Sequence, residues 1–250
     1  NGKAVQLTEA YLSGTDASNY TVSVTGAPLS TAAITKKQLT VGGTLRISNK
    51  TYDASTAATI SNVASLTLVG RVSTDQVTIT QPSSTFSDKK VGTNKTVTLV
   101  SMVLAGSDAT NYTFTLNNAP VGAASITAKS LSLTGTFDAS DKVYDGNRTA
   151  TILVNGLSLD GVEPGDDASM STLQSQFDTS LPGAGKQVAL SSVTLAGVDG
   201  SNYSINLSTA PKTTAAITVK QLSISGSFTV VNKTYDATQN ASILNSSLLT

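Results

Sequence analysis

The chain of 250 residues contains no cysteine, no histidine and no tryptophan. Without cysteine it has no disulfides, thiol nucleophiles or thiolate metal sites, and cysteine usage says nothing about its compartment. Without histidine it lacks the commonest general base and metal ligand, so triads built on histidine and histidine-bound zinc are excluded. We therefore expect no enzyme, no catalytic or cofactor-binding residues and no cofactor.

Charge is also scarce, because sixteen basic and sixteen acidic residues cancel and charged residues make up only 13% of the chain. This balance indicates no nucleic-acid partner. No run of about 18 apolar residues occurs, so we expect no direct membrane insertion. The opening "NGKAVQLTEA" lacks an initiator Met and a signal-peptide pattern, and we expect the chain to be cut from a longer protein.

What the chain has in quantity is Ser and Thr, and these alternate with Val, Ile and Leu. Alternation of this kind favours half-buried strands over disorder. In the segments "KTVTLVSMVLAG" and "NYTFTLNNAP" it predicts that Val97, Leu99 and Val103, and then Tyr112 and Phe114, face a core. The Gly-Asp-Asn clusters "AGSDATNY" and "AGVDGSNY" predict hairpin turns after such strands.

One stretch occurs three times, as "NKTYDASTAATI" from Asn49, "DKVYDGNRTATI" from Asp141 and "NKTYDATQNASI" from Asn232. Its tyrosines lie 92 and 91 residues apart, and the same spacings relate the residues of the Gly-Asp-Asn turns. A period near 91 matches a small domain in tandem rather than a solenoid coil. The predicted domains are the end of one repeat (1–37), two complete repeats (38–129 and 130–220) and the start of another (221–250).

The fold class predicted for each repeat is an all-β, Ig-like β-sandwich, because six or seven short strands occur per copy without a convincing amphipathic helix. The junctions "AAITKKQLTVGG", "ASITAKSLSLTG" and "AAITVKQLSISG" run from strand to strand without a Pro-rich or Gly-Ser linker. Stiff joints of this kind predict an elongated rod.

These motifs resemble the YDG-type and related MBG-type tandem repeats of filamentous-haemagglutinin-like exoproteins of Gram-negative bacteria. The resemblance covers the whole chain, and it implies the stalk of a secreted or surface-displayed adhesin, located outside the cell or at the bacterial cell surface. The family's Gly after Tyr-Asp is present as Gly146 but replaced by Ala54 and Ala237. The Pro of its closing Ile-Thr-Pro-Lys stretch is replaced in all three copies.

The motif Lys-x-Tyr-Asp, here called the KYD motif, is predicted to be structural. We expect each tyrosine to bury its ring, each aspartate to cap a turn and each lysine stem to lie along the surface. The alternative is an isopeptide crosslink from Lys to Asn or Asp. The motif residues are Lys50, Tyr52, Asp53, Lys142, Tyr144, Asp145, Lys233, Tyr235 and Asp236.

The turn residues have two interpretations, of which turn formation is preferred over calcium binding. They are Asp16, Asn19, Tyr20, Asp108, Asn111, Tyr112, Asp199, Asn202 and Tyr203. A separate acidic loop in the second complete repeat is expected to be a solvated surface loop, with a calcium site as the alternative. Its acidic residues are Asp160, Glu163, Asp166 and Asp167.

The sequence is compatible with more than one kind of binding partner. Nearly all aromatic residues recur at repeat positions and are therefore explained as core, which argues against a lectin-like aromatic platform. The alternative to a passive stalk is that the repeats bind a host receptor or matrix polysaccharide, or like repeats on neighbouring chains through exposed strand edges. Recurring Asn-x-Ser/Thr triplets leave a glycan-decorated stalk as a third possibility.

Overall fold

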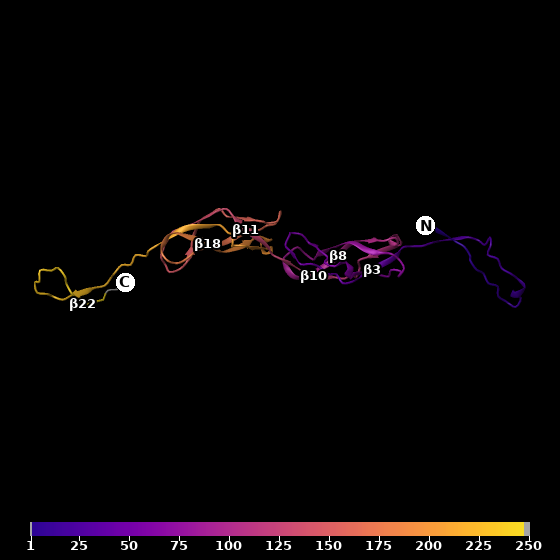
Figure 1. The fold of residues 1–250 in the computed structure, drawn as a ribbon, viewed down its shortest axis with the longest axis horizontal. Helices are drawn as coiled ribbons and strands as arrows, with labels where there is room; N and C mark the ends of the chain where they lie inside the picture. Colours follow the sequence, from indigo (N-terminus) through magenta and orange to yellow (C-terminus); the bar gives the residue numbers. More distant parts are fainter. Residues whose placement is uncertain (1, 248–250) are drawn as a thin grey trace. The chain divides into compact units, whose positions relative to one another are not determined.

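The computed structural model describes residues 2–247, and the chain divides into two compact units, 1–127 and 128–250. The outermost residues of the predicted end segments, 1 and 248–250, lie outside the described part. Within it the fold is all-β, as predicted (Figure 1). The helical segments are 3₁₀ turns of three residues. They are η1 (Ala17–Asn19), η2 (Val63–Ser65), η3 (Ala109–Asn111) and η4 (Gly200–Asn202). No helix among residues 2–247 is long and apolar enough to cross a membrane.

The first unit holds a repeat made of a three-stranded and a five-stranded sheet. In the smaller sheet β3 (Lys37–Gly43) lies between β6 (Leu66–Val69) and β9 (Tyr112–Thr115), antiparallel to β6 and parallel to β9. The larger sheet has the order β4, β10, β8, β7, β5. Its strands are β4 (Lys50–Thr51), β5 (Ala57–Ala58), β7 (Thr78–Phe86), β8 (Gly92–Ala105) and β10 (Gly122–Thr127).

The second unit repeats this topology. Here β11 (Lys129–Thr134) lies between β16 (Ser158–Asp160) and β19 (Tyr203–Ile205), again antiparallel to one and parallel to the other. The five-stranded sheet has the order β13 (Lys142–Val143), β20 (Lys212–Thr218), β18 (Gly183–Ala196), β17 (Ser169–Phe177), β14 (Thr149–Ala150). A further antiparallel pair joins β12 (Phe137–Ala139) to β15 (Ile152–Asn155).

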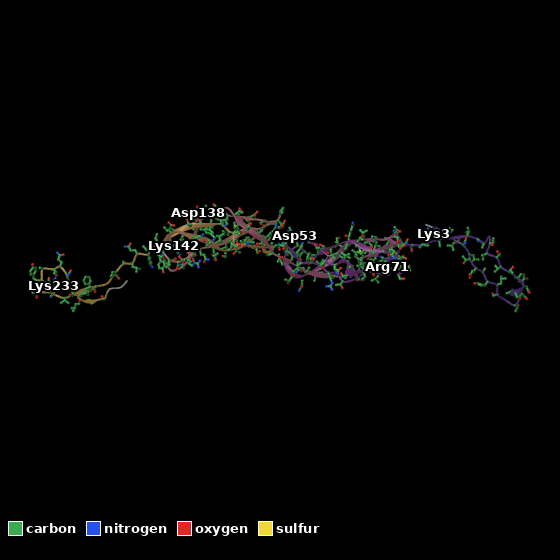
Figure 2. The ribbon with its side chains drawn as sticks, in the orientation of Figure 1. Lys3, Asp53, Arg71, Asp138, Lys142 and Lys233 are labelled. Atoms are coloured by element: carbon green, nitrogen blue, oxygen red, sulfur yellow. The ribbon has the colours of Figure 1, made fainter. Side chains whose placement is uncertain are left out.

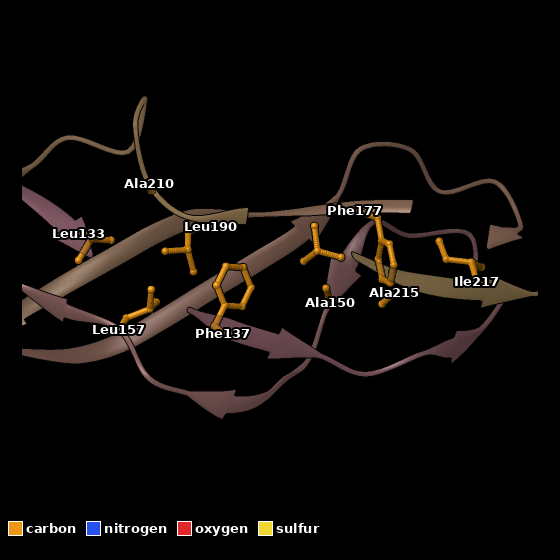
Figure 3. Packing of buried hydrophobic residues seen from close by; sticks show 10 residues of the cluster. Leu133, Phe137, Ala150, Leu157, Phe177, Leu190, Ala210, Ala215 and Ile217 are labelled. Atoms are coloured by element: carbon orange, nitrogen blue, oxygen red, sulfur yellow. The ribbon is translucent and has the colours of Figure 1, made fainter. Parts of the chain in front are cut away.

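Each complete repeat buries a hydrophobic core of its own. In the second repeat the rings of Phe137 and Phe177 point into the layer between the strands that carry them (Figure 3), and Phe177 and Val188 are fully buried. In the first repeat the buried residues include Leu39, Val41, Leu45, Tyr52, Leu66, Val77, Phe86, Val97, Leu99, Met102, Tyr112 and Ile126. Burying such side chains is the main favourable contribution to the stability of each repeat.

Two details of the predicted strand pattern are wrong. Val97 and Leu99 are buried as expected, but Val103 is exposed and Met102 points inward instead. The β7–β8 ladder shifts register between Thr80 and Ser84, and such a shift changes which residues face the core. The predicted hairpin after β8 is instead a crossover between sheets, because β9 pairs with β3.

In the described parts of the two end segments, residues 2–36 and 221–247, the strands form hairpin-like pairs. β1 (Gly2–Val5) pairs with β2 (Ser30–Ala33), and β21 (Phe228–Val230) pairs with β22 (Ile243–Ser246). Tyr20 is exposed here, although its equivalent Tyr112 is buried. Residues 2–33 supply no equivalents of β3 and β6–β7, whose core residues Leu39, Leu68 and Val77 pack with Tyr112 in the complete repeat.

Candidate functional site

The KYD motif of the first repeat forms a compact polar cluster at the start of the five-stranded sheet. Lys50, on β4, donates from Nζ to Asp53 Oδ1 at 2.7 Å, to the Ser55 carbonyl oxygen at 2.8 Å and to Ser55 Oγ at 3.1 Å. Its side chain is only 17% exposed, and Nζ lies 5.6 Å from the centroid of the Phe86 ring. The lysine stem is therefore largely covered, rather than lying along the surface as predicted.

The second repeat builds the same cluster around Lys142, which Figure 2 labels. Its Nζ donates to Asp145 Oδ1 at 2.8 Å and to Asn147 at two atoms, the carbonyl oxygen and Oδ1, both at 2.9 Å. It lies 5.7 Å from the centroid of Phe177. All three ammonium hydrogens thus have acceptors, and the positive charge faces an aromatic ring.

The third copy shows that this cluster forms locally. Lys233 donates to Asp236 Oδ1 at 2.8 Å, and to the carbonyl oxygen and Oγ1 of Thr238 at 2.9 and 2.7 Å, in a segment that lacks the rest of a repeat. The position two after the aspartate is Ser, Asn or Thr in the three copies. Each of these residues supplies both a carbonyl and a side-chain oxygen to the lysine.

The aspartates cap the turn, as the sequence predicts. The backbone N–H of Ser55 donates to Asp53 Oδ1 at 3.0 Å, and that of Asn147 donates to Asp145 Oδ1 at 3.0 Å. Partial burial by itself would raise the pKa of Asp53, but the hydrogen bonds from Lys50 and Ser55 outweigh it and leave the pKa below its ordinary value. The hydrogen bonds from Lys142 and Asn147 likewise lower the pKa of Asp145.

The residue after the aspartate has a left-handed backbone in every copy. The angle φ is +58° at Ala54, +83° at Gly146 and +60° at Ala237. The substitution of the family's glycine by alanine therefore leaves the turn unchanged in shape. It places a Cβ in a conformation that L residues disfavour by about 1–2 kcal/mol.

The tyrosines of the three copies differ, and the prediction that all of them are buried is wrong. Tyr52 is 2% exposed, whereas Tyr144 is 37% and Tyr235 is 91% exposed. Lys89 Nζ lies 5.9 Å from the centroid of the Tyr52 ring and helps to cover it. At the equivalent position, 91 residues on, the second repeat has Ser180, which is too short to cover Tyr144 in this way.

A second recurring arrangement, here called the tyrosine tie, was not found from the sequence. Tyr112 donates its hydroxyl to Asp75 Oδ2 at 2.6 Å and accepts from the Val72 backbone N–H at 3.1 Å. The hydrogen bond to Asp75 raises the pKa of Tyr112. In the second repeat Tyr203 makes the same contacts with Asp166 (2.7 Å) and the backbone N–H of Glu163 (3.0 Å). The 91-residue spacing of Asp75 and Asp166 is the signal that would have revealed it.

The carboxylates of the turn aspartates also connect neighbouring loops. Asp108 and Asp199 precede η3 and η4 and make no side-chain cap there. Instead Asp108 Oδ2 accepts from the backbone N–H of Gln76 at 2.9 Å, and Asp199 Oδ2 accepts from that of Asp167 at 3.1 Å. The remaining predicted turn residues lie in or beside η1, η3 and η4, namely Asp16, Asn19, Tyr20, Asn111 and Asn202.

The acidic loop of the second repeat distributes its carboxylates among different partners. Glu163 Oε1 accepts from Lys129 Nζ at 2.6 Å, and Asp167 Oδ2 from the backbone N–H of Val198 at 3.2 Å. Asp166 belongs to the tyrosine tie, and Asp160 Oδ2 accepts from Ser132 Oγ at 3.3 Å. Within residues 2–247 no three acidic side chains are grouped so that they could hold a metal ion.

Comparison with known proteins gives one match. The family model described as the YDG domain matches residues 35–121 and again residues 127–215. These ranges cover most of the two complete repeats, ending before β10 in the first and within β20 in the second. No curated protein and no solved structure matches the chain.

Proposed function

The chain belongs to the YDG domain family, and from this premise we propose that its repeats are structural units of the stalk of a bacterial adhesin. The stalk is secreted or displayed at the cell surface, where it projects an adhesive region and supports attachment between cells or to surfaces. In this role the repeats contribute length and stiffness, and no catalysis. The KYD motif and the tyrosine tie are then structural elements of each repeat.

The observation that carries the proposal is that each repeat is a self-contained folding unit in tandem. The core cluster around Phe177 uses only residues of the second unit, and the clusters around Leu39 and Leu99 use only residues of the first. We propose that the three-stranded and five-stranded sheets are the two layers of an Ig-like β-sandwich, and that the array is an elongated rod. Stalks are suited to units of this kind, because each unit has a hydrophobic core of its own and can be added in series.

Small-angle X-ray scattering from the purified chain tests the stalk geometry. We expect an elongated particle, and a compact particle would contradict the proposed rod. In the native organism, antibodies against the repeats should label intact cells. Deleting a pair of repeats from the full-length protein should shorten the distance from the cell to an epitope beyond the array. Unlabelled intact cells, with labelling only after lysis, would contradict a surface location.

A second function, direct binding by the repeats, is favoured by a hollow of about 540 Å³ beside the edge strand β14. Its lining includes Arg148, Gln174, Gln176 and Ser191, which offer several hydrogen-bond donors and acceptors to a polysaccharide or a receptor loop. β14 pairs with β17 and ends the sheet, so a like repeat on a neighbouring chain has an edge to pair with. Glycan-array binding that is lost in Gln174→Ala, or association that increases with concentration, would favour this function.

A further inference from the structure

The first and last segments of each repeat run side by side and in the same direction. In the first repeat β3 is parallel to β9 from the pair Lys37–Tyr112, and β4 is parallel to β10 up to the pair Thr51–Thr127. The backbone N–H of Tyr52 donates to the Thr127 carbonyl oxygen at 2.8 Å. We call this arrangement, residues 37–52 with residues 112–127, the terminal strand pair. The chain therefore enters the repeat at one end of the terminal strand pair and leaves it at the other end.

The two segments stay together where they pass from one sheet to the other. The paired residues differ by 75 positions in β3–β9 and by 76 in β4–β10, so the register slips by only one residue. Gly122, the first residue of β10, lies so close to Leu45, in the link from β3 to β4, that a Cβ at Gly122 would be 2.7 Å from the Leu45 carbonyl oxygen.

The second repeat contains an equivalent pair. There β11 is parallel to β19 from the pair Lys129–Tyr203, and β13 is parallel to β20 up to the pair Val143–Thr218. The backbone N–H of Tyr144 donates to the Thr218 carbonyl oxygen at 2.9 Å.

Side chains that directly precede the KYD motif strengthen the exit end of the pair. The β8–β10 ladder shifts register between Ala124 and Ile126, and the backbone N–H of the intervening Ser125 donates to Asn49 Oδ1 at 2.8 Å. In the second repeat the backbone N–H of Ala216 donates to Asp141 Oδ1 at 2.6 Å. A side-chain oxygen at this position, of an amide in Asn49 and of a carboxylate in Asp141, thus joins the first segment to the last in both repeats.

We propose that the terminal strand pair is a shear-loaded mechanical clamp, which makes each repeat resistant to tension applied along the chain. This inference rests on the proposed stalk function, in which the array transmits force. Tension pulls residue 37 and residue 127 apart along the strand direction. Because the two segments are parallel, they must slide past each other, and all of the hydrogen bonds between them are loaded together.

Other directions of loading lack this property. β7 and β8 form an antiparallel hairpin that is closed by residues 87–91. Force applied across its open end separates one pair of residues at a time, so each hydrogen bond carries the load alone. Forced unfolding is governed by the unfolding rate along the loaded path, and the two directions should therefore differ in strength within the same folded repeat.

Single-molecule force spectroscopy on the full chain tests the proposal, and the absence of native cysteine allows handles at chosen sites. The end-loaded construction carries Lys36→Cys and Ala128→Cys, and the hairpin-loaded one carries Ser73→Cys and Ser107→Cys. We expect a clearly higher unfolding force for the end-loaded chain. Equal forces, or a lower force for the end-loaded chain, would overturn the clamp.

The variant Asn49→Ala isolates the contribution of the Asn49 side chain to the mechanical strength of the terminal strand pair. Loss of one hydrogen bond under load should speed end-loaded unfolding about fivefold at a fixed force and leave hairpin-loaded unfolding unchanged. Asn117→Ala, on the exposed turn between β9 and β10, is the matched control and should change neither. An equal effect of Asn49→Ala in both directions would mean general destabilisation and would also overturn the proposal. Because the assay uses the purified chain, its outcome is independent of where the protein is located in the cell.

Discussion

Removal of one hydroxyl, by Tyr112→Phe, should destabilise the first repeat and leave the second unchanged. The hydroxyl donates to the Asp75 carboxylate at 2.6 Å and accepts from the Val72 N–H at 3.1 Å. A hydrogen bond to a charged group contributes about 1.5–3 kcal/mol and a neutral one about 0.5–1.5 kcal/mol. Water can reach Asp75 once the hydroxyl is gone, so the expected net loss is about 2 kcal/mol, near the lower end of the sum.

Hydrogen exchange followed by mass spectrometry measures this loss repeat by repeat. A loss of about 2 kcal/mol corresponds to roughly thirtyfold faster exchange through global opening of the first repeat. Peptides from residues 129–218 act as an internal reference, and Tyr203→Phe should give the reciprocal pattern. Tyr20→Phe is the control, because this tyrosine is 70% exposed and its loss should have no effect. Unchanged exchange in Tyr112→Phe, or equal acceleration in both repeats, would refute the assigned role of the tie.

Three further predictions concern the KYD motif. Gly146→Ala should destabilise the second repeat by about 1 kcal/mol, because the alanine must adopt a φ of +83°; no clash adds to this loss, since a Cβ there meets no atom within 4 Å. Ala54→Gly should not destabilise the first repeat, and chemical denaturation measures both variants. The pKa of Asp145 is lowered on folding from an ordinary value of 3.8, so its contribution to stability is present above that pH and fades as the pH falls through the folded value. Thermal melts of wild type and Asp145→Asn should therefore converge in acid, and a constant difference would contradict the ion pair. Intact mass spectrometry should give the uncrosslinked mass, because Lys142 Nζ is held by hydrogen bonds to Asp145 and Asn147; a loss of one water would show an isopeptide bond to Asp145, and a loss of one ammonia a bond to Asn147.

The alternation of polar and apolar residues was sufficient to predict the all-β class, and the local sequence was sufficient to predict the turn of the KYD motif. Periodicity identifies equivalent positions, and an Asx turn depends only on residues close in sequence. This is why Asp53 and Asp145 cap their turns as predicted, and why the same cluster forms around Lys233 in an incomplete repeat.

Predictions of burial were wrong where the burial of a side chain depends on the tertiary fold around it. Val103 faces solvent because β8 carries one extra residue, Val100, between the pairs Leu99–Ser84 and Ser101–Ser83, and this bulge inverts the alternation beyond it. Tyr144 is more exposed than Tyr52 because a residue about 37 positions downstream is Ser180 in one repeat and Lys89 in the other. Identical motifs can therefore differ in burial.

By itself the sequence determined that the chain is a tandem array of β-repeats without disulfides or histidine chemistry, since composition and period are properties of the chain alone. Only the tertiary structure decided that β3 and β4 pair in parallel with β9 and β10, which come some 75 residues later. Parallel pairing between remote segments leaves no local signal, because its hydrogen bonds join backbone groups that every residue except proline possesses. That pairing places the entry and exit of each repeat at opposite ends of one strand pair, and from it comes the expectation that the repeat resists tension.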